Sequence, residues 1–258
     1  MIQILLHSSK TMRIPQSYEA PLGRPQLLAV ASEIVAKIQR MTRDELAHMM
    51  ALSPTKATEV EQMYARWTPG DVGVPVIDIF VGDIYSGLQV QTWSAQDRAY
   101  AQQHLLVLSG LYGGLRACDG ILPYRLEMGY SLPDGGPLHK YWGNRIASIV
   151  PEGISAIINL SAVEYTKSLL PHLSHSVVAP RFLTVSAKTG VPTFVTVHTK
   201  IARGAFARWL IRERIDTLSD LPSFDDLGYA YDAAQSTPEQ PVFVCQEFGG
   251  IGLSVRKT

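Results

Sequence analysis

The chain alternates between short apolar runs and longer segments whose apolar residues recur every three or four positions. Apolar runs of four to eight residues, bounded by glycine, proline or polar residues, are typical of buried β-strands. The first such run, at residues 2–6, is followed by a loop over 7–25 that contains three prolines. The strands that this pattern predicts lie at 2–6, 76–81, 105–108, 156–160, 177–185, 193–198, 229–231 and 242–245.

Helical periodicity and capping residues predict the remaining elements. Thr42 and Glu45 have the spacing of a capping box, and Ser53-Pro54 is a second helix start. The predicted helices cover 26–40, 43–51, 54–67, 94–104, 139–150, 162–170 and 200–215. Strands mixed with helices, without an internal repeat or a linker, indicate a single domain over 1–258 of the α/β (α+β) class. We expect a mixed β-sheet core flanked by helices.

Charge and composition narrow the function classes. The 258 residues include 23 basic and 23 acidic ones, so the formal net charge is zero and any basic site has to be local. No apolar run approaches the roughly 18 residues of a membrane span, so no membrane partner is expected. The first apolar run is too short for a signal peptide. Cys118 and Cys245 lie far apart and form no disulfide framework. We therefore expect a cytoplasmic protein.

Familiar catalytic and cofactor motifs are missing from the chain. There is no GxxxxGK[ST] loop, no GxSxG elbow and no HExxH pair. His172 and His175 are three residues apart, but proline and serines around them favour a loop, and no third ligand is near in the sequence. The sequence therefore predicts neither a metal nor a cofactor.

Polar clusters follow several of the predicted strands. They lie at 7–11, 82–85, 109–129, 159–167 and 198–204. Open α/β sheets bind ligands outside the carboxyl ends of their strands, so these clusters are expected to form one cleft.

The order of these clusters resembles the YaaA family, bacterial proteins linked to peroxide stress and long classed as a domain of unknown function. The resemblance rests on Gly-Asp-Ile-Tyr-Ser-Gly-Leu at 82–88, Leu-Ser-Gly-Leu-Tyr-Gly-Gly-Leu-Arg at 108–116 and Pro-Tyr-Arg-Leu-Glu-Met-Gly at 123–129. Shorter matches are Lys10-Thr11, Tyr141-Trp142-Gly143, Asn159-Leu160, Glu164-Tyr165 and Ala202-Arg203-Gly204. Because the matches run in order over nearly the whole chain, a YaaA-like fold is implied.

Four departures from the family pattern mark a divergent member. The family's Ser-Pro-Ala before the lysine is His7-Ser8-Ser9 here. The family's Arg-Pro-Leu-Asp is Arg116-Ala117-Cys118-Asp119 in this chain. His198 replaces a tyrosine, and Ile201 replaces the second lysine of a pair. A specialised paralogue with its own substrate is consistent with these changes.

The resemblance implies a first hypothesis, in which the protein acts in the response to hydrogen peroxide and binds DNA through a positively charged cleft. The zero net charge and the lysine lost at Ile201 weigh against it, since each phosphate contact needs a cation. The second hypothesis is an enzyme that acts on a small anionic or nucleotide-like substrate, in a specialised biosynthetic pathway. The third is a purely structural network of buried ion pairs. The oligomeric state is left open.

Candidate site residues follow from their chemistry. Lys10, Tyr112 and Glu127 are placed nearest the chemistry, Lys10 as a desolvated base or nucleophile and Glu127 as its ion-pair partner or a general acid. The predicted ligand-binding residues are Arg116, Arg125, Lys200, Arg203, Tyr85, Asp119, Trp142, Asn159, Glu164 and His198. Arginines bind phosphate or carboxylate bidentately, and Tyr112 and Trp142 could stack on a planar base.

Overall fold

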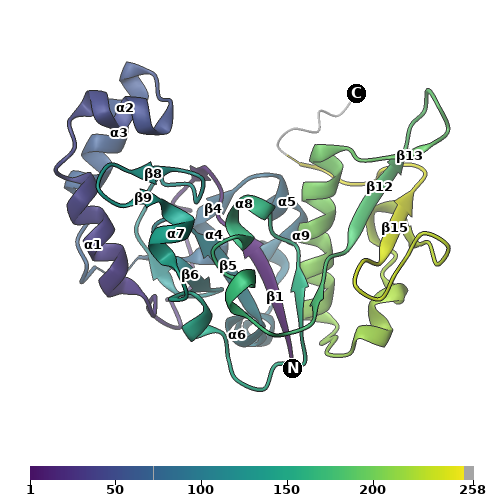
Figure 1. Ribbon diagram of the computed structural model, residues 1–258. Helices are drawn as coiled ribbons and strands as arrows, with labels where there is room; N and C mark the ends of the chain where they lie inside the picture. Colours follow the sequence, from purple (N-terminus) through teal and green to yellow (C-terminus); the bar gives the residue numbers. More distant parts are fainter. Residues whose placement is uncertain (72, 253–258) are drawn as a thin grey trace.

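A computed structural model describes residues 1–71 and 73–252, and its centre is a five-stranded mixed sheet (Figure 1). The strand order is β11 (Val177–Val178), β10 (Ala156–Asn159), β1 (Ile2–His7), β5 (Leu105–Ser109) and β6 (Gly113–Arg116). The first four strands are parallel, and β6 returns antiparallel to β5. Strands buried on both faces read as continuous apolar runs, which explains why β1 was recognisable from the sequence. The predicted mixed sheet is confirmed.

A second sheet lies beside the first, and the longest helix separates them. Its strand order is β13 (Pro192–Thr193), β12 (Arg181–Val185), β15 (Val242–Cys245) and β14 (Tyr229–Tyr231). The helix α9 (Thr196–Arg212) runs between the two sheets in Figure 1. Phe206 of α9 packs edge-on against Phe182 of β12, with ring centroids 5.6 Å apart. One helix therefore contributes to the packing of both sheets.

The other helices cover the main sheet and form an extension at one end of the molecule. The longer ones are α1 (Leu28–Ile38), α2 (Arg43–Met50), α3 (Pro54–Ala65) and α6 (Ala95–His104). The short ones are α4 (Val76–Ile79), α5 (Asp83–Leu88), α7 (Leu138–Trp142) and α8 (Val163–Thr166). The predicted capping box of α2 is present, with Thr42 and Glu45 each accepting the other's backbone N–H. None of the helices in 1–71 and 73–252 is both long and apolar enough to cross a membrane.

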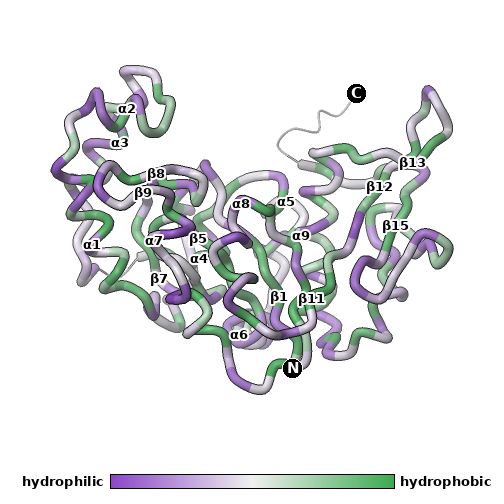
Figure 2. The backbone as a smooth tube through the Cα atoms, in the orientation of Figure 1, coloured by the Kyte–Doolittle hydropathy of each residue, from purple (hydrophilic) through white to green (hydrophobic). Residues whose placement is uncertain are grey.

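Small two-stranded sheets and short 3-10 turns complete the chain. The strand pairs are β2 (Thr11–Met12) with β4 (Phe80–Val81), β3 (Val74–Pro75) with β7 (Gly120–Ile121), and β8 (Ser131–Leu132) with β9 (Gly136–Pro137). The 3-10 turns cover Val90–Thr92, Ala147–Ile149, Leu170–His172, Leu218–Ser223 and Asp226–Gly228. In Figure 2 the strands that meet at the centre, β1 among them, are mostly hydrophobic, in keeping with their burial.

Three of the predicted strands are wrong in part. The expected strand at 76–81 is the helical turn α4 followed by the two residues of β4, because a short, fully buried apolar run has no periodicity that separates the two conformations. The expected strand at 177–185 is interrupted at Pro180, so that β11 joins the main sheet and β12 the second. The expected strand at 193–198 ends at Thr193, and α9 already begins at Thr196.

The predicted helix at 139–150 is also broken. Gly143, with a φ of +52°, ends α7 after Trp142, and only a 3-10 turn follows at Ala147–Ile149. Glycine adopts this left-handed backbone without the steric penalty of a side chain. The sequence showed the glycine, but a helical pattern on both sides of it concealed the break.

Helices α5 and α9 touch through their backbones at two glycines. A Cβ atom built on Gly204 of α9 would lie 1.8 Å from the carbonyl oxygen of Ile84, and one on Gly87 of α5 would lie 2.0 Å from that of Ile201. Arg208 of α9 also donates from Nη1 to the carbonyl oxygen of Gly87 at 2.9 Å. This contact fixes α5 beside the middle turns of α9.

Replacing Gly204 by alanine is expected to separate α5 from α9. The added methyl has no room because the atom it meets is backbone, so we expect Gly204→Ala to lower the free energy of unfolding by about 3 kcal/mol or more. Gly70→Ala is the matched control, since a Cβ there meets nothing within 4 Å. Urea denaturation of both variants checks the prediction. Equal stability of the two would contradict the packing described.

Candidate functional site

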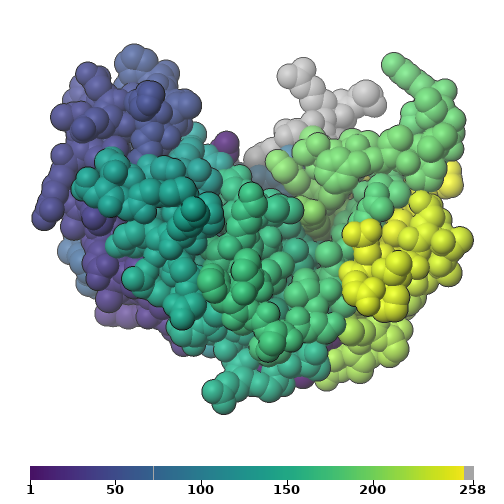
Figure 3. Space-filling model, viewed as in Figure 1, coloured from purple at the N-terminus to yellow at the C-terminus, as the bar shows by residue number. Residues whose placement is uncertain are grey.

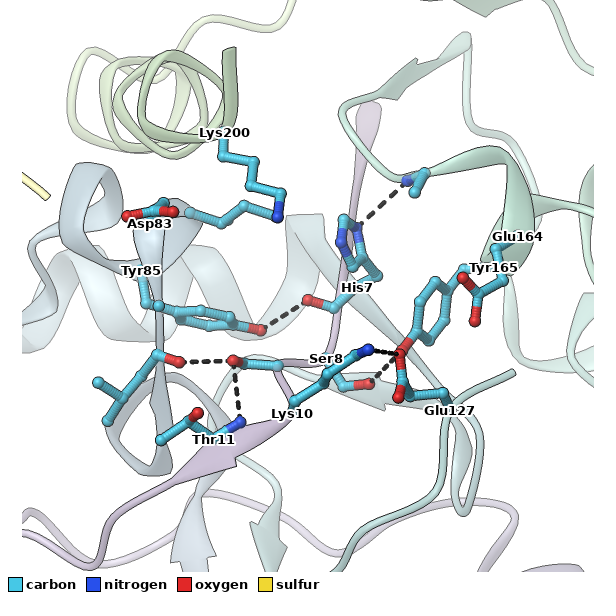
Figure 4. A pocket seen from close by; sticks show the side chains of 15 residues that line it. His7, Ser8, Lys10, Thr11, Asp83, Tyr85, Glu127, Glu164, Tyr165 and Lys200 are labelled. Atoms are coloured by element: carbon cyan, nitrogen blue, oxygen red, sulfur yellow. Dashed lines mark hydrogen bonds and ion pairs between the residues drawn. The ribbon is translucent and has the colours of Figure 1, made fainter. Parts of the chain in front are cut away.

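A pocket of about 450 Å³ lies at the carboxyl ends of β1 and β10 (Figure 4). Its walls come from the loop after β1, from α5, from the segment around Glu127, and from the starts of α8 and α9. The lining residues are His7, Ser8, Ser9, Lys10, Thr11, Val81, Gly82, Asp83, Ile84, Tyr85, Glu127, Ala162, Glu164, Tyr165 and Lys200. The strand ends are where open α/β sheets place their ligands, and the pocket lies at that edge.

Hydrogen bonds hold the loop after β1 against α5 and β4. The Tyr85 hydroxyl donates to the carbonyl oxygen of His7 at 3.0 Å. The Ser9 hydroxyl donates to the carbonyl oxygen of Val81 and accepts from the backbone N–H of Thr11 at 3.2 Å. The position of α5 therefore determines where the residues of this loop lie.

One side of the pocket carries carboxylates whose oxygens already accept hydrogen bonds. Glu127 pairs with Lys10, with Nζ and Oε2 3.0 Å apart, and its other oxygen accepts from the Tyr130 hydroxyl at 2.6 Å. Burial and then the neighbouring Glu127 raise the pKa of Tyr130 to about 12, so its hydroxyl stays a donor. Glu164 accepts from the backbone N–H of Gly129 at 2.9 Å. These contacts fix both carboxylates in place.

Lys10 is 62% exposed, whereas its partner Glu127 is only 13% exposed. Lys10 thus lacks the desolvation on which the predicted role as base or nucleophile depends. Its contact with Glu127 fits the ion pair that the sequence suggested.

The other side of the pocket gathers cations around a neutral histidine. Nδ1 of His7 accepts from the backbone N–H of Ala162 at 3.2 Å, and the imidazole stacks on Tyr165 with centroids 4.8 Å apart. Burial, Arg203 and Lys200, in that order, lower the pKa of His7 to about 3. His7 is therefore uncharged at neutral pH, and the positive charge at this end comes from α9.

Arg203 has a donor nitrogen without a hydrogen-bond partner among the described residues. Its Nε atom is buried and forms no hydrogen bond within residues 1–71 and 73–252. Burial lowers the pKa of this guanidinium, although an arginine so far above neutrality keeps its charge. Neither Lys200 nor Arg203 occurs among the ion pairs of the described part of the chain.

The structure brings only part of the predicted set to this pocket. Five of the predicted residues line it, namely Lys10, Tyr85, Glu127, Glu164 and Lys200. Arg203 lies close enough to His7 to lower the histidine's pKa. The other predicted residues are absent from the lining.

Arg116 and Asp119 lie toward the opposite end of the sheet. Arg116 pairs in register with Leu106, near the start of β5, whereas the pocket is at the carboxyl ends of the parallel strands. Asp119 is buried and accepts from the backbone N–H of Arg116 at 2.9 Å and from Gln102 at 3.0 Å. Burial raises the pKa of Asp119 to about 6. The contact between these two residues stabilises the turn after β6, and neither residue lines the pocket.

Tyr112 and Trp142 belong to the core. The Tyr112 hydroxyl accepts from Nε1 of Trp67 at 3.0 Å, and burial raises the pKa of Tyr112 to about 12. Trp142 donates from Nε1 to the carbonyl oxygen of Gly110 at 3.0 Å. With at most 1% of either residue exposed, neither ring offers a face on which a base could stack.

Arg125, Asn159 and His198 also have local partners. Arg125 lies beside the Tyr130 hydroxyl, although its buried Nε has no hydrogen-bond partner among the described residues. Asn159 accepts from the backbone N–H of Ser161 at 3.0 Å. His198 stacks on a phenylalanine ring, and its Nδ1 lies 3.0 Å from the Thr184 hydroxyl. These three residues support the edges of the site without lining the pocket.

Sequence reasoning missed His7 and Tyr165 as site residues. His7 and Tyr165 lie in the polar clusters at 7–11 and 159–167, but neither was singled out as a site residue. The positions of these residues at the ends of strands could have identified them. His7 is the last residue of the central strand β1, and Tyr165 follows β10 in the helix α8. Their stacking across the two parallel strands could not be read from the sequence.

Protonation of His7 is expected to destabilise the folded protein. The unfolded chain protonates this imidazole near its ordinary pKa of 6.5 and the folded chain only near 3, so its stabilising effect is complete above pH 6.5 and is lost below it. His7→Asn keeps an acceptor for Ala162 but does not titrate. In urea denaturation, the stability of the wild type relative to His7→Asn should fall by about 1 kcal/mol per pH unit below pH 6.5. A pH-independent difference would contradict the assignment.

Comparison with known proteins gives matches along nearly the whole chain. A family model described as "Peroxide stress protein YaaA" matches residues 2–235. A UPF0246 protein of Salinispora tropica is 48% identical over 258 residues, covering 98% of both chains. UPF0246 proteins of Marinomonas sp. and Ruegeria sp. are 37% and 36% identical, covering 95% and 93% of this chain and 98% of each relative.

Proposed function

Because this chain belongs to the family of the peroxide stress protein YaaA, we propose that it acts in the response to peroxide by binding a small anionic, nucleotide-like molecule in this pocket. One observation carries the proposal. Two cations of α9, Lys200 and Arg203, converge on the neutral His7 at a concave site, and Nε of Arg203 has no hydrogen-bond partner among the described residues. A buried polar group without a partner is costly unless a ligand supplies one.

The distribution of hydrogen bonds favours an anion at the α9 end. The carboxylates Glu127 and Glu164 already accept from Lys10, Tyr130 and Gly129, so they are occupied by donors of the protein. One buried donor, Nε of Arg203, remains without a partner on the other side. An acceptor-rich group, such as a phosphate, complements that side.

The size of the pocket favours a small molecule. About 450 Å³ falls within the range of small-molecule and cofactor sites. Three carboxylates, those of Asp83, Glu127 and Glu164, line the same pocket and would repel a continuous phosphate backbone. The net charge of zero is in line with a compact anion.

DNA binding stays a prediction of the family resemblance. Figure 3 shows the surface hollowed between the α2 and α3 end and the β12–β13 hairpin, and the DNA hypothesis places the nucleic acid on this concave face. Such binding would draw on exposed cations at the rim, among them Lys188 in the hairpin. DNA binding is therefore expected to depend on Lys188, whereas binding of a small ligand in the pocket is not.

Isothermal titration with adenosine monophosphate, and in parallel with duplex DNA, tests the proposal. We expect Lys200→Gln to weaken the nucleotide about tenfold or more, the loss typical of one charge-assisted hydrogen bond. Lys188→Gln makes the same charge change on the exposed hairpin and should bind the nucleotide like the wild type. Nucleotide binding should change little between about 50 and about 200 mM salt.

Two results would contradict the small-ligand proposal. One is an absence of nucleotide binding together with duplex binding that falls steeply with salt. The other is an equal loss of nucleotide affinity in Lys200→Gln and Lys188→Gln, which would mean that general charge, and not the pocket, holds the nucleotide.

The cysteines are unsuited to sensing peroxide directly. Burial raises the pKa of Cys118 to about 12 and also raises that of Cys245, and both thiols are buried. Peroxide oxidises the thiolate and not the thiol. The proposed role in peroxide stress therefore does not pass through oxidation of these two cysteines.

We expect folded protein treated with hydrogen peroxide to keep both thiols reduced, as measured by mass spectrometry after alkylation. The same treatment in urea is the control and should oxidise both residues, because unfolding removes their burial. Rapid formation of sulfenic acid at Cys118 or Cys245 in the folded protein would contradict this account.

A further inference from the structure

We propose that His7 determines the specificity of the pocket by donating its Nε2–H to a phosphate group held between Lys200 and Arg203. This inference rests on the proposed function and goes further, because it names a phosphate monoester as the ligand group and a third donor that binds it.

The hydrogen-bond partners of His7 fix its tautomer. The backbone N–H of Ala162 can only donate, and it lies 3.2 Å from Nδ1, so Nδ1 has to be the unprotonated acceptor. The Ser161 hydroxyl lies 3.3 Å from the same nitrogen. A neutral imidazole with an unprotonated Nδ1 carries its hydrogen on Nε2.

The same geometry keeps His7 uncharged. A proton on Nδ1 would point at the N–H of Ala162, and Lys200 and Arg203 of α9 would repel the resulting charge. The other charged or titratable groups that line the pocket are Asp83 and Tyr85 of α5, Glu164 and Tyr165 of α8, and the ion pair of Lys10 with Glu127. His7 thus supplies a donor without a third positive charge.

The imidazole is held in a single orientation. Its ring stacks on Tyr165 at an interplanar angle of 26°, and its backbone carbonyl accepts from the Tyr85 hydroxyl at 3.0 Å. In Figure 4 the side chain of Lys200 extends from α9 toward His7 across the pocket. The imidazole is therefore already oriented in the unbound protein.

Two donors that line one end of the pocket, His7 and Lys200, and a third that lies close to His7, Arg203, select the ligand group. Lys200, Arg203 and Nε2 of His7 can donate, and none of them can accept. A phosphate monoester presents three terminal oxygens to such a set, whereas a carboxylate presents two. A phosphate group is therefore expected to bind more tightly than a carboxylate of similar size.

Two substitutions of His7 distinguish the contributions of its two ring nitrogens to binding. His7→Asn places an amide oxygen near the position of Nδ1, which keeps the acceptor for Ala162 and removes the Nε2 donor. His7→Gln places an amide nitrogen near the position of Nε2 and gives up the acceptor at Nδ1. With adenosine monophosphate as the probe, isothermal titration should show about tenfold or greater loss of affinity in His7→Asn and a smaller loss in His7→Gln. Inorganic phosphate should also bind more tightly than acetate.

Nitrogen NMR of His7 gives a readout that needs no ligand. In the unbound protein at neutral pH, Nε2 should carry the hydrogen and Nδ1 should be unprotonated. The opposite tautomer, or a charged imidazole, would overturn the inference. Wild-type affinity in His7→Asn, in a protein that does bind the nucleotide, would overturn it while leaving the proposed function intact. If the wild type binds no anion at all, the proposed function is wrong, and the inference about His7 that rests on it is wrong as well.

Discussion

The backbone contact between α5 and α9 is the constraint on which the rest of the site depends. Each helix reaches the other at a glycine, so that the carbonyl oxygen of Ile84 lies where a side chain on Gly204 would begin. Because α9 also packs against β12 through Phe206, the same helix joins the pocket to the second sheet. Lys200 and Arg203 owe their position beside His7 to this packing, and α5 in turn holds the loop after β1 through Tyr85.

The pocket combines two electrostatic environments at one edge of the main sheet. Glu127 and Glu164 are fixed by donors of the protein, whereas the side near α9 keeps a donor that the described residues leave unsatisfied. His7 lies on the side near α9 and stays neutral because burial and the two cations oppose its protonation. This division is how a chain with no net charge would present the proposed local site for an anion.

The sequence predicted the location of the site better than its members. Apolar runs identified the central strands, and some of the polar clusters at the strand ends lie at the edge where the pocket is found. Lys10 and Lys200 were found because they follow such strands or begin the basic helix. Arg116 was assigned to the same edge, but the antiparallel return of β6 carries it toward the other end of the sheet. Tyr112 was also misplaced, because a tyrosine near glycines reads as a surface residue until its hydroxyl is seen to bond inside the core.

The most direct test of the account is a crystal structure of the protein with adenosine monophosphate bound. The account predicts that the phosphate lies between Lys200 and Arg203, with one oxygen within hydrogen-bonding distance of Nε2 of His7. A phosphate bound at Arg116, or on the exposed hairpin around Lys188, with this pocket left empty, would contradict it.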